Sequence, residues 1–306
     1  MHAVLAFLCQ PGFFGSTPVR HALLTGAVVA LISGAVGVFT VLRSQSFAGH
    51  ALSDLGTLGG SGAYLAGVDP LLGIVGVGVV VAGLMDLFGA ERGRARDVST
   101  GIVLGAVLGC SALLLYLDTT RSSTTGAAVT ILFGSLFAVT GDTVPATVGL
   151  GLLGIAALTL LYRPLLLSSV DRDLAAARGV RVRLLGLVFL ATMGIAVSLA
   201  ALTVGTILSP ALLIGPAATA LRLTRRPFTA MALAAGLGLG ATWLGVLLAY
   251  DSYTWPPAGA HGWPVSFFVM ALIFTGYLLS GPAGRIREHR ERGRGRESAP
   301  VRTLEA

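Results

Sequence analysis

The sequence contains nine apolar segments, and their length constrains the fold more than any other feature. Most approach the roughly 20 residues that a helix needs to cross the hydrocarbon core of a bilayer. Of the 306 residues, 54% are hydrophobic and only 11% are charged, whereas soluble domains carry about 25% charged residues. Because backbone groups in lipid must be satisfied internally, we expect an all-α polytopic membrane protein of about nine transmembrane helices. The segments are residues 21–42, 46–66, 70–89, 98–117, 143–162, 184–201, 205–221, 228–250 and 264–281.

The basic residues orient these segments. All 21 of them are arginines, and most lie in loops between segments or after the last one. The net charge of +7 therefore indicates membrane topology rather than nucleic-acid binding, because arginine-rich loops stay in the cytoplasm. We expect a multi-pass protein of the bacterial cell membrane with a cytoplasmic C-terminus and, after nine spans, an external N-terminus. The orienting residues are Arg92, Arg94, Arg96, Arg163, Arg172, Arg178, Arg181, Arg183, Arg222, Arg225, Arg226 and the arginines from Arg285 onward.

The chain divides into three parts. Residues 1–20 form an N-terminal segment of uncertain position, residues 21–283 form the transmembrane domain, and residues 284–306 form an Arg-rich cytoplasmic tail that we expect to be disordered. Within the transmembrane domain, segment 126–139 is too short to cross the membrane. We expect it to be a half-helix, which is tolerated at membrane depth only when it is buried in protein.

His50 and Asp54 are two metal-type ligands inside one apolar segment. They are four residues apart, so a helix projects both from one face. An ionisable group within a membrane costs roughly 3 kcal/mol or more, which favours a transport or binding site. The alternative is that both residues lie near the outer interface and only anchor the helix.

The loop after residue 168 predicts a short helix on the cytoplasmic side. Asp171 can cap its N-terminus, the alanines at 175–177 favour helix, and Gly179 can end it. Such a helix suits docking into a groove on a partner protein, and the alternative is an ordinary loop with one helical turn.

Segment 205–221 has the composition of a broken helix. Pro210 and Pro216 each remove a backbone hydrogen bond, and Gly205 with other small residues allows close helix packing. A broken helix beside a pathway is common in transporters, and a kinked structural helix is compatible with the same pattern.

Five stretches in order resemble the permease subunits of bacterial ABC importers for zinc, manganese and iron(II). They are residues 37–43, 46–54, 131–139, 173–180 and 204–220, and together the resemblance covers about residues 20–281. The resemblance implies the fold of a type II ABC importer permease, with the stretch 204–220 as its broken, gating helix. In the second stretch the family's usual order is Asp and then His. Here His50 takes the Asp position and Asp54 the His position, at the same spacing and on the same face.

The resemblance also implies partners and a mechanism. Two permease copies form the pathway, a cytoplasmic ATP-binding subunit drives it, and an extracytoplasmic metal-binding protein delivers the ion. A divalent zinc, manganese or iron ion passes His50 and Asp54, and no cofactor is bound covalently. The sequence contains no lysine, so it cannot form a P-loop, and ATP must be hydrolysed by the partner. The chain is thus expected to be a transporter and not an enzyme. The residues implied in ATPase docking are Asp171, Asp173, Leu174, Ala175 and Gly179.

Two other functions stay open on the sequence. A permease for a metal chelate, of the siderophore or vitamin B12 type, shares the architecture without needing a His/Asp pair. A proton-driven secondary transporter would use His50 and Asp54 as a proton relay and would need no ATPase subunit.

Overall fold

The computed structural model describes residues 15–88, 94–121, 131–134, 136–139, 141–252 and 262–297. Within these ranges the chain is all-helical and contains no strand, which confirms the predicted all-α architecture. Two short elements, the 3-10 turn η1 (Leu136–Ala138) and the helix α8 (Arg172–Ala177), accompany the long helices. The long helices are α2 (Thr17–Leu42), α3 (Ser46–Ala66), α4 (Pro70–Phe88), α5 (Arg94–Arg121), α7 (Thr143–Val170), α9 (Val182–Val204), α10 (Ser209–Leu223), α11 (Pro227–Asp251) and α12 (Val265–Glu297).

Each of the nine predicted apolar segments coincides with one of these long helices. By length and hydropathy, five described helices qualify as membrane spans: α2, α7, α9, α11 and the first part of α12, Val265–Pro282. Among the others, α10 has only 15 residues, and α3 carries His50, Asp54 and several hydroxyl groups that lower its hydropathy. The number of nine transmembrane helices therefore stays a prediction.

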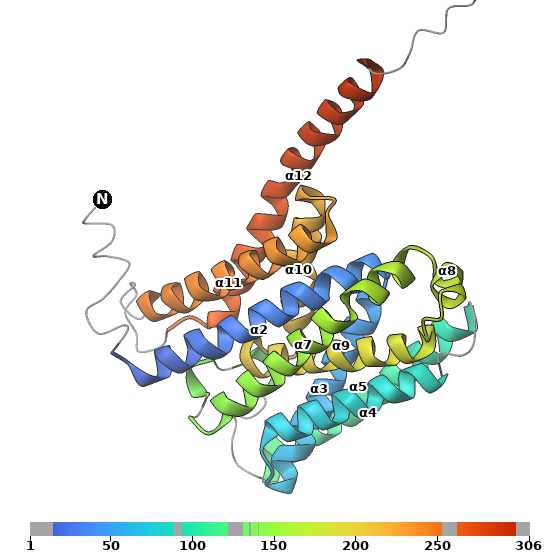
Figure 1. Ribbon diagram of the computed structural model, residues 1–306. Helices are drawn as coiled ribbons and strands as arrows, with labels where there is room; N and C mark the ends of the chain where they lie inside the picture. The colour runs from blue at the N-terminus through green and yellow to red at the C-terminus, as the bar shows by residue number, and fades with distance from the viewer. Residues whose placement is uncertain are drawn as a thin grey trace, which may run out of the picture.

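Helix α2 lies at the centre of the bundle. It packs against α7, α9, α10 and α11 (Figure 1). A side chain at Gly37 would overlap the carbonyl group of Leu213 in α10, so the two backbones approach closely. Phe39 is fully buried and meets the rings of Tyr162 and Phe189 edge-on, with centroids 5.9 and 6.4 Å away. Small residues at crossings and aromatic rings between them are how membrane helices pack without a hydrophobic driving force.

Helices α3, α4 and α5 form a group on one side of the bundle (Figure 1). Helix α3 packs against α4, α5, α9 and α10, so it joins this group to the centre. At the crossing of α3 and α4, Gly59 and Gly73 face each other, and a side chain on either would overlap the other's backbone. This crossing fixes the position of α3, the helix that carries His50 and Asp54.

Helix α12 projects away from the bundle as one long helix (Figure 1). It is held to α10 by Arg222, whose guanidinium carbon lies 3.8 Å from the ring centroid of Tyr277. The helix continues through residues 284–297, where the sequence predicts a disordered tail. Glutamates and arginines recur there at helical spacing, for example Glu288 and Arg292, and such pairs stabilise a helix. Residues 298–306 of that tail lie outside the described residues.

Other expectations also concern residues that the structure does not describe. They are residues 1–14 of the N-terminal segment, Arg92, and residues 126–130 of the half-helix. The described part of that half-helix contains one helical turn at 131–133, a left-handed Gly134 with φ of 72°, and then η1. Ile131 and Leu136 are buried there, so this short element packs inside the protein as expected.

Candidate functional site

His50 and Asp54 lie side by side on α3, one turn apart. The distance from His50 Nε2 to Asp54 Oδ2 is 3.9 Å, and the two side chains are 55% and 22% exposed. Two atoms that share a tetrahedral ion at about 2.1 Å lie roughly 3.4 Å apart. A small rotamer change would therefore let both side chains bind one ion, as the spacing predicts.

The pair belongs to an open face of α3. Between residues 49 and 63, all positions of the helix are buried apart from every fourth one: His50, Asp54, Leu58 and Gly62. Phe47, which is 56% exposed, extends the same face toward the start of the helix. The rest of α3 is covered by α4, α5, α9 and α10. Among the residues that the structure describes, the face of α3 with the metal-type ligands is thus the one that stays partly exposed.

The pair lies toward the end of the bundle that carries α8. Arg43, just before α3, donates from Nη1 to Ser168 Oγ in the last turn of α7 at 2.8 Å, and α8 follows α7 directly. His50 is four residues into α3, about 6 Å from its first residue. The pair therefore lies near the end of the bundle at which α7 meets α8.

A hydroxyl cluster joins α3 to the break between α9 and α10. Ser53 donates to the carbonyl oxygen of Thr206 and shares a hydrogen bond with Ser209 Oγ. Thr57 Oγ1 donates to Thr206 Oγ1 at 2.9 Å, and Ser61 donates back to the Thr57 carbonyl. All five side chains are buried. The cluster ties the helix of the metal ligands to the broken helix.

We did not predict this cluster, although the sequence contains a signal for it. Ser53, Thr57 and Ser61 repeat every four residues, so they line one face of α3 beside the open face. Hydroxyl groups at such spacing indicate a polar contact between membrane helices. Their partners, Thr206 and Ser209, lie about 150 residues away in the chain, and nothing in the spacing points to them.

The predicted broken helix is present. Helix α9 ends at Val204, Gly205 adopts φ 96° and ψ 156°, and α10 begins at Ser209. Pro210 lies in the first turn of α10, where its missing N–H is tolerated. Pro216 lies inside α10 and removes one of the helix's internal hydrogen bonds. The segment is therefore interrupted mainly at Gly205.

The break is filled by the short element after residue 131. The amide groups of Thr206 and Ile207 donate to the carbonyl oxygens of Ile131 and Leu132 at 3.1 and 3.3 Å. A side chain at Gly134 would overlap the backbone around Gly205, and one at Gly205 would overlap the backbone of residues 132–134. These contacts satisfy backbone groups that the break leaves without helical partners, as membrane burial requires.

Helix α8 has the expected caps. Asp171 accepts hydrogen bonds from the amides of Asp173 and Leu174 at 2.8 and 2.9 Å, and Gly179 has φ of 80° just beyond the helix. Ala175 is fully buried, whereas the Leu174 side chain is 44% exposed. The helix packs on α7 and α9. Asp173 and Leu174 thus lie exposed on the surface, and Ala175 packs the helix against the bundle.

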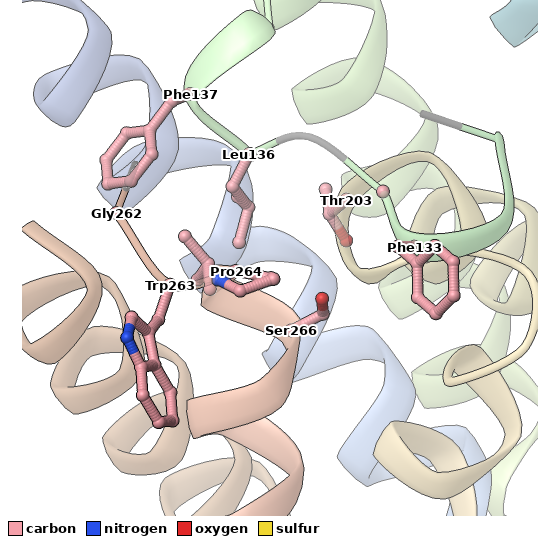
Figure 2. A pocket seen from close by; sticks show the side chains of 10 residues that line it. Phe133, Leu136, Phe137, Thr203, Gly262, Trp263, Pro264 and Ser266 are labelled. Carbon is pink, nitrogen blue, oxygen red and sulfur yellow. The ribbon is translucent and has the colours of Figure 1, made fainter. Parts of the chain in front are cut away.

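A pocket of about 150 Å³ lies where the short element meets the start of α12. Figure 2 shows Leu136, Pro264 and Ser266 in its middle, with Phe133 and Thr203 to one side and Trp263 to the other. Thr203 is one of the last residues of α9 before the break. The pocket therefore borders the broken helix at the end of the bundle away from α8.

Comparisons with known proteins agree on one family. The model of the ABC 3 transport family matches residues 17–275. The chain is 32% identical to the manganese import system permease protein ScaB of Streptococcus parasanguinis over 233 residues, which cover 76% of this chain and 82% of that one. It is 30% identical to the high-affinity zinc uptake system membrane protein ZnuB of Haemophilus influenzae over 209 residues, 67% of this chain and 78% of that one. PsaBC from Streptococcus pneumoniae, solved in complex with Fab, superposes with a TM-score of 0.74 at 27% identity and covers 90% of this chain and 95% of that one.

Proposed function

The chain belongs to the ABC 3 transport family, and on that premise we propose that it is the membrane permease subunit of an ATP-driven importer of divalent metal ions. A permease of this family is not an enzyme, and ATP is hydrolysed by a separate subunit. The observation that carries the proposal for this chain is the His50/Asp54 pair on the open face of α3.

The pair alone supplies too few ligands to strip water from a metal ion. Within the described residues there is no group of three or more His, Cys, Asp or Glu side chains that could hold a metal. Zinc sites use four ligands. We infer that a second copy of the chain covers the open face of α3 across a two-fold axis and brings its own His50 and Asp54. A two-fold contact uses the same surface on both copies, so four ligands would surround the ion.

In this proposal, the ATP-binding subunit acts on the permease through α8. The ATP-binding subunit docks on the exposed side of α8, and an extracytoplasmic metal-binding protein delivers the ion from the other side. ATP binding then shifts the paired permeases between outward-open and inward-open states. Nine transmembrane helices with the C-terminus in the cytoplasm place α8 and the arginine-rich loops on the side of the ATPase.

The transported metal is manganese or zinc in this proposal. Two relatives are named for these metals, ScaB for manganese and ZnuB for zinc. Imidazole and carboxylate ligands suit both ions, and iron(II) as well. The exchanged order of His50 and Asp54 changes which ligand an ion meets first along the pathway, so selectivity has to be measured for each metal.

The test is metal uptake into proteoliposomes that contain this chain, its ATP-binding subunit and its metal-binding protein. Manganese, zinc and iron(II) are supplied separately as radioactive ions. We expect ATP-dependent uptake of at least one metal, and loss of that uptake in His50→Ala and Asp54→Ala. Leu58→Ala is the matched control, because Leu58 lies on the same open face without a ligand atom.

Other outcomes would contradict the proposal in distinct ways. Normal uptake by both alanine variants would exclude the His50/Asp54 site. Uptake of a metal chelate but not of free ions would favour a chelate permease, and uptake without the ATP-binding subunit would favour a proton-driven transporter. A bound metal count of one per chain rather than one per two chains would exclude the shared four-ligand site.

A further inference from the structure

A second pocket lies at the junction of α2 and α7, beside the first residue of α8. Its volume is about 250 Å³, enough for several water molecules. Arginine and serine side chains make up most of its wall. It is lined by Leu42, Arg43, Ser44, Ser168, Ser169, Val170 and Arg172.

Two guanidinium groups face this junction pocket without an acidic partner. In the part of the chain that the structure describes, no carboxylate lies within 4.0 Å of Arg43 or Arg172. Arg43 is held in place by Ser168 and by the ring of Phe189, whose centroid lies 5.4 Å from the guanidinium carbon. Burial, and then the positive charge of Arg172, lower the pKa of Arg43 from its usual value, but an arginine stays protonated in proteins.

The junction pocket therefore holds positive charge that no described carboxylate neutralises, and this favours binding of an anion. Arg43 Nε is buried and has no hydrogen-bond partner, which costs stability unless a ligand accepts its proton. Asp171 and Asp173 flank Arg172 in the sequence, but neither lies within 4.0 Å of Arg43 or Arg172, and Asp171 already accepts hydrogen bonds from the amides of Asp173 and Leu174. Two like charges held together with an unused donor are typical of a site whose anion comes from outside the chain.

The surroundings favour a phosphate group. Guanidinium groups bind phosphate oxygens through paired hydrogen bonds, and serine hydroxyls can donate further ones. Leu42 is 39% exposed and Val170 is 82% exposed beside the charged wall. An apolar rim next to a basic pocket at the cytoplasmic end of membrane helices is the setting in which lipid headgroups bind.

We propose that the junction pocket binds a phosphate group, supplied by an anionic phospholipid of the inner leaflet or by free inorganic phosphate. Bound phosphate bridges the end of α2 to Arg172, the first residue of α8, and so holds α8 in a fixed orientation. The proposal requires only the chain and the anion. It does not depend on metal transport, although the lipid source depends on the cytoplasmic orientation of this end.

The experiment measures binding to the purified full-length chain in detergent by native mass spectrometry and calorimetry. The probes are phosphatidylglycerol, phosphatidylcholine and inorganic phosphate. The variants are Arg43→Gln and Arg172→Gln, and Arg178→Gln is the matched control, because it removes one positive charge after α8 without touching the pocket. Arg172 is exposed, so its variant should fold even if Arg43→Gln does not.

We expect the wild type to bind phosphatidylglycerol or inorganic phosphate at least about tenfold more tightly than either pocket variant. A hydrogen bond to a charged group stabilises a complex by an energy that corresponds to a change of about tenfold or more in the dissociation constant. Preference for phosphatidylglycerol over both other probes identifies a lipid site, and binding of inorganic phosphate alone identifies a free anion site. Equal binding by wild type and Arg172→Gln, or an equal loss in Arg178→Gln, would overturn the proposal. So would no binding of either phosphate probe to the wild type, which would leave the pocket to an acidic side chain of a partner.

Discussion

The substitution Gly205→Ala tests the account of the broken helix most directly. Gly205 has φ 96° and ψ 156°, a region that is essentially restricted to glycine and costs other residues about 1–3 kcal/mol. The added Cβ would also overlap the backbone of residues 132–134, and such overpacking typically costs about 1–3 kcal/mol more. We therefore expect a loss of about 2–6 kcal/mol in the free energy of unfolding.

The matched control is Gly236→Ala in α11. Gly236 lies inside a helix, and no neighbouring atom lies within 4 Å of the position that an alanine Cβ would take, so alanine should stabilise the helix by about 0.5–1 kcal/mol. Thermal unfolding of the purified chain in detergent, followed by size-exclusion of the surviving fraction, compares the two variants. A melting temperature for Gly205→Ala that is not lower than that of Gly236→Ala by roughly 4 °C or more would refute the reasoning.

Three further predictions concern the helices around the site. Ser53→Ala leaves buried partners in the hydroxyl cluster unsatisfied and should lower the free energy of unfolding by about 1–3 kcal/mol. The control Thr159→Ala, on the exposed side of α7, should change it by no more than about 0.5 kcal/mol. Equal melting temperatures of the two variants would contradict this prediction. Asp171→Ala removes the cap of α8 and should weaken binding of the ATP-binding subunit about fivefold in a pull-down, since a cap contributes about 1 kcal/mol. Asp171→Ser keeps a capping oxygen and should bind normally in the same assay. The double exchange His50→Asp with Asp54→His keeps both ligand types and should change the metal preference. Metal uptake should stay within about 10- to 100-fold of wild type, which is the usual effect of altered ligand surroundings. A complete loss of uptake, as in a single alanine variant, would show that the order of the two ligands is essential.

Local features of the structure followed from the sequence. The nine apolar segments coincide with the long helices because the length of an apolar segment, and the Gly, Pro and Arg residues that end it, are local signals. Asp171 caps α8 as expected, and the interruption at Gly205 lies where small residues and prolines gather. The spacing of His50 and Asp54 was sufficient to place them on one face, because the helical period fixes that relation.

Relations between distant segments could not be predicted in the same way. The contact of Gly134 with Gly205 and the bonds of Ser53 to Thr206 join residues 70 to about 150 positions apart. They depend on how the helices cross, which one sequence does not reveal. The tail was expected to be disordered because it is polar and charged, whereas the backbone of α12 continues through it to Glu297.

The central place of α2 has a consequence for how the protein is made. This helix is synthesised early, yet its broadest partner, α11, begins at Pro227, roughly 185 residues after α2 ends. At about 5–20 residues per second, α2 waits roughly 10–40 s in the lipid before that partner exists. During this interval lipid tails cover the surface that later becomes core. A helix that ends up largely enclosed must therefore also be stable alone in the bilayer, and the mean hydropathy of α2, 2.2 over 18 residues, is high enough for that.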